Sequence, residues 1–265
     1  MDPAAVRDAL NRAPGAVAVC VQASESSTGV AHPIRELAEV TRQSGACLVV
    51  DAVSALGAMP LPMDEWGIDV LLTASQKALM LPPGLAFGAA SPKAWRRIDD
   101  GNLPRFYFDW RAEVVAQRRG QALWTPAISL ILGLAEVLRW LHEEGLEAVF
   151  ARHDRLARAT RAAMKALGLS IFAKRPVPSL TTVNCPVDGE ALIKLIRENY
   201  GVTLAGGQEA ARGKILRIAH LGYADDFDVV VAVAAIERGL SDLGYRKTPF
   251  GTGVGAALAE LGSAG

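Results

Sequence analysis

A single lysine, Lys77, stands between two apolar segments and is the first candidate for chemistry. Residues 68–72 precede it as a predicted strand, and residues 85–89 follow it as another. Lysine is almost never fully buried without a partner, and a common reason to hold an amine in such surroundings is that its neutral form can make a Schiff base with a carbonyl group. A loop lysine whose ammonium group reaches water is the alternative, and Lys77 taken alone favours it.

The second candidate, Asp51, directly follows the apolar segment 47–50. Residues 16–21, 33–45 and 47–50 have the pattern of a strand, a helix and a strand, which predicts a right-handed βαβ unit with a parallel sheet. Ligands of open α/β sheets bind at the carboxyl ends of the strands. An amine and a carboxylate at that edge are the two protein groups that a pyridoxal phosphate (PLP) site needs. For Asp51 alone, a helix cap or a surface turn is the alternative.

Three motifs together carry a resemblance to a known family. They are ESSTG at residues 25–29, VVDAVSALGAMPLPMDEWGIDVLLTASQKALMLPPGLAF at residues 49–87 and GKILRIAHLG at residues 213–222. The chain resembles the class V, fold-type I PLP-dependent aminotransferases, above all the alanine–glyoxylate and serine–glyoxylate (serine–pyruvate) branch. The SQKALMLPPGLAF block is the specific part, whereas STG alone is a weak signal. The likeness extends from residue 16 nearly to the end of the chain.

This resemblance implies a cofactor, PLP, and the residues that hold it. Lys77 is then the Schiff-base lysine. Asp51 pairs with the pyridinium nitrogen, and Val53 packs against one face of the ring. Ser26 lies near the ring substituents, and Gln76 contacts the phosphate.

Two further roles follow from the resemblance. Thr125 stands close to the place where the family supplies a hydroxyl group to the phosphate of the neighbouring subunit. Arg217 grips the α-carboxylate of the substrate, for which a bidentate guanidinium is the natural geometry. The apolar residues around Arg217 predict a half-buried position, and Gly206-Gly207 is either the turn that places it or a plain tight turn.

The fold expected from this resemblance is the α/β fold of the type I PLP transferases. Residues 1–130 form a large domain with a mostly parallel sheet, and residues 131–265 form a connecting helix and a smaller C-terminal α/β domain. In the family, a glycine-containing turn that cradles the phosphate precedes the ESSTG motif. Nothing in residues 1–15 replaces such a turn, so the sequence predicts that the N-terminal part of the large domain is missing.

The other predicted elements position these residues. Strands 16–21 and 47–50 are expected to be covered on both faces, and residues 100–123 to be irregular. A long helix from residue 125 is expected to have five residues on its buried side: Leu130, Leu134, Val137, Leu138 and Leu141. Residues 181–184, 202–204 and 215–219 are predicted strands of the smaller domain. Residues 252–265 are predicted to form a weak helical turn or more.

Composition excludes several classes of protein. The 265 residues carry 28 basic and 28 acidic side chains, so no basic face predicts a nucleic-acid partner. No apolar run approaches the ~20 residues of a membrane span, and the first residues lack a secretory signal. The three cysteines predict buried free thiols in a reducing compartment, and the four scattered histidines predict no metal site. The expected location is the cytoplasm.

The predicted function is transamination from a small L-amino acid, serine or alanine, to a 2-oxo acid such as glyoxylate or pyruvate, in a homodimer. The aromatic, arginine-containing segment 105–111 is expected to contact the second subunit rather than single-stranded nucleic acid. Two alternatives stay open. One is a PLP lyase of the cysteine-desulfurase type, although the cysteines have strand-like surroundings rather than a mobile loop. The other is a catalytically impaired fragment of the aminotransferase.

Overall fold

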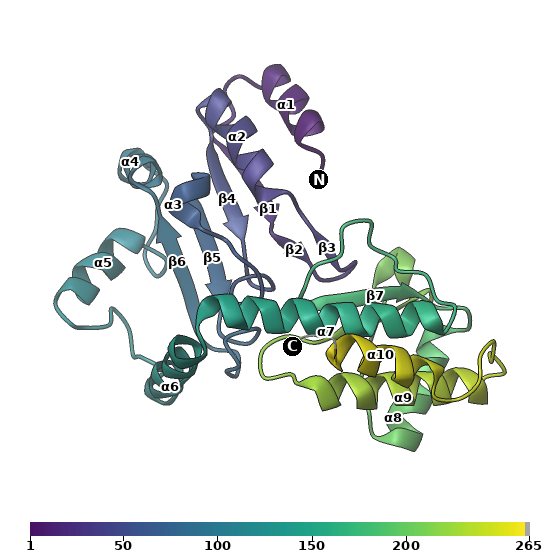
Figure 1. Ribbon diagram of the computed structural model, residues 1–265. Helices are drawn as coiled ribbons and strands as arrows, with labels where there is room; N and C mark the ends of the chain where they lie inside the picture. Colours follow the sequence, from purple (N-terminus) through teal and green to yellow (C-terminus); the bar gives the residue numbers. More distant parts are fainter. Residues whose placement is uncertain (263–265) are drawn as a thin grey trace. The chain divides into compact units, whose positions relative to one another are not determined.

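The structure is a computed structural model that describes residues 1–262 (Figure 1). Contacts divide the chain into two compact units, and neither unit is one continuous stretch. The first consists of Met1–Val21, Pro33–Asp51 and Pro62–Trp140, and the second of Gln22–His32, Ala52–Leu61 and the chain from Leu141 onward. The division into domains at residue 130 stays a prediction.

The first unit is built around a four-stranded sheet. Its strands are β1 (Ala18–Gln22), β4 (Cys47–Asp51), β5 (Val70–Ala74) and β6 (Ala86–Ala90), in the order β1-β4-β5-β6 (Figure 1). Strands β4 and β5 are parallel, with Asp51 opposite Leu72. Strand β6 runs antiparallel to β5, with Ala86 opposite Ala74. The predicted α/β class with a mainly parallel sheet is confirmed.

Helices α1 (Pro3–Arg12), α2 (Ile34–Ser44), α3 (Met63–Trp66) and α4 (Pro92–Asp100) belong to the same unit. Helix α2 buries Leu37 and Val40, and it ends at Gly45, whose φ of 77° is the left-handed conformation that glycine adopts readily. At the start of α4, the Ser91 side chain accepts a hydrogen bond from the Ala94 amide, which satisfies one of the free donors of the first turn.

The prediction that strands β1 and β4 are covered on both faces is wrong for β1. In β1, Val19 packs with α1 and α2, whereas Ala18 and Cys20 are exposed. In β4, Cys47, Leu48 and Val50 are buried and Val49 is half-buried, so this strand is covered on both faces over most of its length. Strand β1 has one covered face, and Cys20 is not the buried thiol that was expected. Cys47 is buried and Cys185 half-buried, and all three are free.

Residues 100–123 are not irregular throughout. They contain α5 (Trp110–Arg118), and the Asp109 side chain caps it by accepting a hydrogen bond from the Arg111 amide. A second correction concerns α6 (Ile128–Glu144), where Leu138 is 51% exposed instead of buried. Gly145 separates α6 from α7 (Leu146–Ala166), as the sequence predicted.

The second unit combines a three-stranded antiparallel sheet, a short hairpin and helices. The sheet has the order β7-β9-β8, from β7 (Leu180–Asn184), β9 (Ile215–Ala219) and β8 (Ala205–Gly206), and the hairpin pairs β2 (Ser24–Glu25) with β3 (Val30–Ala31). The strand predicted at residues 202–204 thus lies slightly later. The helices besides α7 are α8 (Gly189–Tyr200), the short 3-10 helix η1 (Glu209–Ala211), α9 (Asp226–Asp242) and α10 (Thr252–Gly262).

Apolar side chains from α7, α8, α9, α10 and the sheet form one core in this unit, with Leu156, Met164, Ile196 and Ile236 fully buried. Helix α10 runs alongside α7 (Figure 1). The predicted helical turn at the end of the chain is therefore a helix of three turns, and residues 263–265 lie outside the described part. Over residues 1–262, no helix combines the length and the apolar character needed to cross a membrane.

Candidate active site

Asp51 and Lys77 lie at or just after the ends of two neighbouring parallel strands. Strand β4 ends on Asp51, and β5 ends on Ala74, three residues before Lys77. Because β4 and β5 run in the same direction, both residues lie toward the same edge of the sheet, which is where α/β sheets bind ligands. Asp51 is exposed and Lys77 is half-buried.

Hydrogen bonds to Ser75 shape the loop that carries Lys77. The Ser75 hydroxyl donates to the Pro82 carbonyl at 2.8 Å and accepts from the Leu85 amide at 3.2 Å. The Ser75 carbonyl accepts from the Leu81 amide at 3.1 Å. Met80 has a φ of 57°, a strained conformation for a residue with a side chain. A fully buried serine thus closes the loop, so the lysine stands on a structured turn. Gln76, next to it, is exposed.

In the second unit, the structure brings Ser26 and Arg217 together. The Arg217 side chain donates from Nη1 to the Ser26 carbonyl at 2.9 Å and from Nε to the Gly206 carbonyl at 2.7 Å. Arg217 is half-buried on β9 between buried Leu216 and Ile218, as expected. Two backbone carbonyls therefore fix the guanidinium plane, while its Nη2 has no hydrogen-bond partner within residues 1–262.

The turn that contains Ser26 is closed by its own residues. Glu25 accepts hydrogen bonds from the amide and the hydroxyl of Ser27, at 2.8 and 2.7 Å. These hydrogen bonds, with smaller contributions from His32 and Arg217, lower the pKa of the Glu25 carboxyl group. Gly29, with a φ of 71°, faces Thr182, whose side chain leaves no room for a Cβ. The lowered pKa favours the ionised form of Glu25. The turn packs tightly against β7.

Sequence reasoning missed two serines that hold this turn. The Ser54 and Ser26 hydroxyls are hydrogen-bonded at 2.7 Å, and the Ser179 hydroxyl donates to the Ser54 carbonyl at 3.0 Å. Val53, half-buried, directly precedes Ser54. No sequence signal distinguishes these serines from ordinary loop residues, because their partners lie 28 and 125 positions away.

The remaining predicted residue, Thr125, is exposed in the segment between α5 and α6 and makes no hydrogen bond within residues 1–262. The structure thus groups Asp51 with Lys77 in the first unit and Ser26 with Arg217 in the second. Thr125 also belongs to the first unit.

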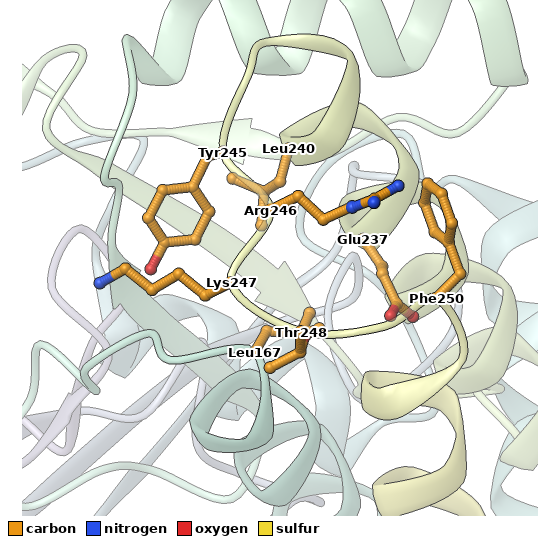
Figure 2. Close-up of a pocket in the computed structure, with 8 residues that line it drawn as sticks. All are labelled: Leu167, Glu237, Leu240, Tyr245, Arg246, Lys247, Thr248 and Phe250. Atoms are coloured by element: carbon orange, nitrogen blue, oxygen red, sulfur yellow. The ribbon is translucent and has the colours of Figure 1, made fainter.

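A small cavity in the second unit offers no alternative site. Figure 2 shows its lining, which includes Glu237, Tyr245, Arg246 and Phe250. Its volume of about 10 Å³ is space for about one water molecule. The Glu237 carboxylate is already used, since it accepts a hydrogen bond from the Thr252 amide at 3.1 Å, and Arg246 lies over the Phe250 ring at 5.4 Å. No group of three or more metal-ligating side chains occurs among the described residues.

Comparison with known proteins identifies the family. Residues 1–224 match the family described as aminotransferase class-V, and the chain therefore belongs to that family. The resemblance read from the sequence motifs is confirmed.

Individual relatives show the extent of the match. A protein of Synechococcus sp. (strain PCC 6716) named soluble hydrogenase, small subunit, is 42% identical over 251 residues, which are 93% of this chain and 65% of that protein. Serine–glyoxylate aminotransferase of Arabidopsis thaliana is 37% identical over 253 residues, 92% of this chain and 63% of the enzyme. The chain thus spans less than two thirds of the length of these two relatives.

Among solved structures, pyridoxamine–pyruvate aminotransferase from Mesorhizobium loti superposes on 100% of this chain with a TM-score of 0.92 and 34% sequence identity. The superposition uses 70% of that enzyme's chain. The predicted fold is thereby confirmed.

Proposed function

We propose that the protein is a PLP-dependent transaminase that moves an amino group from a small L-amino acid, serine or alanine, to a 2-oxo acid such as glyoxylate or pyruvate. The observation that carries this proposal is the placement of Asp51 and Lys77 after adjacent parallel strands in a chain of the aminotransferase class-V family. The reaction takes place in the cytoplasm.

The side chains present fit PLP by their chemistry. Lys77 offers an amine for the aldehyde carbon, and Asp51 offers a carboxylate for the ring nitrogen. In this proposal the Ser26 hydroxyl would lie near the ring substituents, Val53 would pack against one face of the ring, and Gln76 would contact the phosphate. When bound, the cofactor supplies an aromatic ring that draws off the electrons left when a bond at the substrate Cα breaks.

In the reaction, each residue of the chain has a defined task. Lys77 takes the proton from the substrate Cα and returns it, a kind of step that is typically worth ~10²–10⁴-fold in rate. The Asp51 carboxylate would hold a proton on the ring nitrogen. Arg217 orients the substrate through its α-carboxylate, since two backbone carbonyls hold its Nε–H and one Nη1–H and leave the Nη2 group for a carboxylate.

The protein acts as a homodimer in this proposal. Exposed aromatic residues of the first unit support it: Phe106 and Phe108 are 79% and 84% exposed, and Tyr107 stacks on Trp124 at 4.9 Å. Apolar surface of this kind marks interaction sites. Thr125, beside Trp124, then reaches the cofactor phosphate of the second copy. Light scattering on the purified protein tests this, and the mass of a monomer would contradict it.

The test of the cofactor assignment is covalent capture. PLP is added to the purified protein, the absorbance of the lysine adduct is recorded, and borohydride then fixes the adduct. We expect the added mass on the peptide that contains Lys77. Lys77→Ala is expected to abolish both signals, whereas Lys165→Ala, a change at an exposed lysine of the second unit, leaves them intact. A colourless wild-type protein that PLP does not stabilise against heat would contradict the proposal and favour the impaired fragment.

The desulfurase alternative requires a reactive thiolate. Burial raises the pKa of the Cys185 thiol to about 11, and burial followed by the charge of Asp69 raises that of Cys47. Both groups are therefore protonated thiols at neutral pH. Only Cys20 is exposed, and it lies in strand β1 rather than on a loop. These facts favour the transaminase.

A further inference from the structure

The serines behind Arg217 form part of a closed path of hydrogen bonds. Arg217 donates to the Ser26 carbonyl, and the Ser26 and Ser54 hydroxyls are bonded to each other. The Ser179 hydroxyl donates to the Ser54 carbonyl, and the Ser179 carbonyl accepts from the His220 amide at 3.2 Å. His220 directly follows β9, three residues after Arg217. The path therefore begins on β9 and ends at the residue that directly follows it.

A closed path constrains more than an open chain of contacts, because each member is held from two sides. Ser54 is the member that joins its two halves. Its hydroxyl binds Ser26 at 2.7 Å, and its carbonyl binds Ser179, which is 2% exposed. Removing the Ser54 hydroxyl opens the path at the point nearest the Ser26 turn but leaves the backbone bond to Ser179 in place.

The other hydrogen bonds of the Ser26 turn join backbone groups and do not hold the Ser26 hydroxyl. The Thr28 and Gly29 amides bond to the Glu25 carbonyl, at 3.2 and 2.8 Å, and close the turn on itself. The Val177 amide bonds to the Gly29 carbonyl at 3.0 Å and holds the far end of the turn. The side chain of Ser26 depends on Ser54.

We propose that Ser54 is a positioning residue: its hydroxyl holds the Ser26 turn so that the Ser26 carbonyl sets the orientation of the Arg217 guanidinium for the substrate α-carboxylate. This inference rests on the proposed function, in which Arg217 binds that carboxylate. Ser54 itself touches neither substrate nor cofactor in this role. Its influence passes through Ser26, and a threonine at the same position preserves the hydroxyl.

The first test needs neither cofactor nor activity. Hydrogen–deuterium exchange is measured by mass spectrometry on peptides that cover residues 22–32 in the wild type, Ser54→Ala and Ser54→Thr. A hydrogen bond of ordinary net strength corresponds to about 3–10-fold in an equilibrium. We therefore expect amides of the Ser26 turn to exchange about 3–10-fold faster in Ser54→Ala, and Ser54→Thr to restore the wild-type rate.

Ser170→Ala is the matched control. It also removes one serine hydroxyl in the second unit, where the Ser170 hydroxyl accepts a hydrogen bond from Asn184 at 2.9 Å, but it lies outside the path. Exchange in residues 22–32 is expected to be unchanged in this variant. Equal exchange in Ser54→Ala and Ser170→Ala would overturn the proposal.

The second test addresses substrate orientation in the PLP-loaded protein. We expect Ser54→Ala to raise the KM for L-serine and for glyoxylate by about 3–10-fold with kcat within about twofold of wild type, and Ser54→Thr to restore KM. A loss of kcat and thermal stability that threonine does not rescue would show a merely structural residue and overturn the proposal. Failure of the proposed function is recognised separately, because the wild type would then show no turnover while the exchange comparison still decides the role of Ser54 in holding the turn.

Discussion

The guanidinium of Arg217 illustrates how one side chain is fixed before any ligand arrives. Its Nε and Nη1 donate to the Gly206 and Ser26 carbonyls at 2.7 and 2.9 Å. Arginine has five donors in a rigid planar fork, so hydrogen bonds from Nε and Nη1 fix the plane and with it the directions of the remaining N–H groups. A lysine ammonium group has no plane to fix.

We predict that Arg217→Lys raises the KM for both the amino acid and the 2-oxo acid by about 10–100-fold, because a charged bidentate contact worth about 1.5–3 kcal/mol is lost. The kinetics of both half-reactions provide the measurement. Arg158→Lys, at an exposed ion pair with Asp154 in the same unit, is the control and should change neither KM. An unchanged KM in Arg217→Lys would place the carboxylate elsewhere.

At this scale the sequence drew attention to Lys77 and Arg217 but not to Ser54 and Ser179. Lys77 and Arg217 are conspicuous because a charge among apolar neighbours requires an explanation. Ser54 and Ser179 are inconspicuous because serine is common in loops. Their significance depends on partners far along the chain, which no local pattern encodes.

At the scale of the elements, the turn after β8 has room only for a glycine, Gly207. A Cβ on Gly207 would lie 1.9 Å from the Ala211 carbonyl oxygen, which no rotamer change relieves. The preceding carbonyl, that of Gly206, accepts the Nε–H of Arg217. The close approach of the backbone at Gly207 therefore places the carbonyl that orients Arg217.

We predict that Gly207→Ala lowers the free energy of unfolding by about 2 kcal/mol or more, since the backbone of the turn must move. Urea denaturation measures the effect. Gly255→Ala serves as the control, because Gly255 lies in α10 with nothing near the place of a Cβ, and alanine there should stabilise by about 0.5–1 kcal/mol. Equal stability of Gly207→Ala and wild type would contradict the clash.

The elements themselves were largely predictable, and their errors have physical causes. Strand β5 was expected from residue 68 but starts at Val70. The buried Asp69 carboxylate accepts a hydrogen bond from the Leu48 amide at 3.0 Å, so the Leu48 amide bonds a side chain, and regular strand pairing begins one residue later, at Val49 and Val70. Val202 and Leu204 looked like a strand but pack against the apolar core without pairing. Both errors come from tertiary contacts that override a local pattern.

For the molecule as a whole, two buried histidines link stability to pH. Burial lowers the pKa of His220 to about 3, and burial also lowers the pKa of His153. The His153 ring is held in its neutral form, since Nδ1 bonds the Val149 carbonyl at 2.7 Å and Nε2 accepts from the Gly222 amide at 3.0 Å. His220 bonds Thr181 through Nε2 at 2.9 Å.

The sign of the effect follows from proton binding. Below a pH of about 6.5 the unfolded chain protonates these histidines while the folded chain does not, so stability falls as the pH falls. We predict that His220 alone lowers the free energy of unfolding by about 2 kcal/mol when the pH falls from 7.5 to 5. Urea denaturation at several pH values measures this.

His220→Asn should reduce the slope, whereas His142→Asn, at an exposed position on α6, should keep it. Hydrogen bonds from Ser27 and Arg152 lower the pKa values of Glu25 and Glu144. These carboxyl groups therefore change the free energy of unfolding mainly below pH 5. The window from pH 5 to 7.5 therefore isolates the histidines. A slope identical in His220→Asn and wild type would contradict the assignment.

The path of the chain through its two units has an evolutionary consequence. The first 61 residues alternate between the units, at Val21, His32, Asp51 and Leu61, before the last change at Trp140. A single genetic crossover after residue 130 would transfer the later part of the second unit without the β2–β3 hairpin and without Ser54. Exchange of one complete unit between relatives would therefore require several crossovers rather than one.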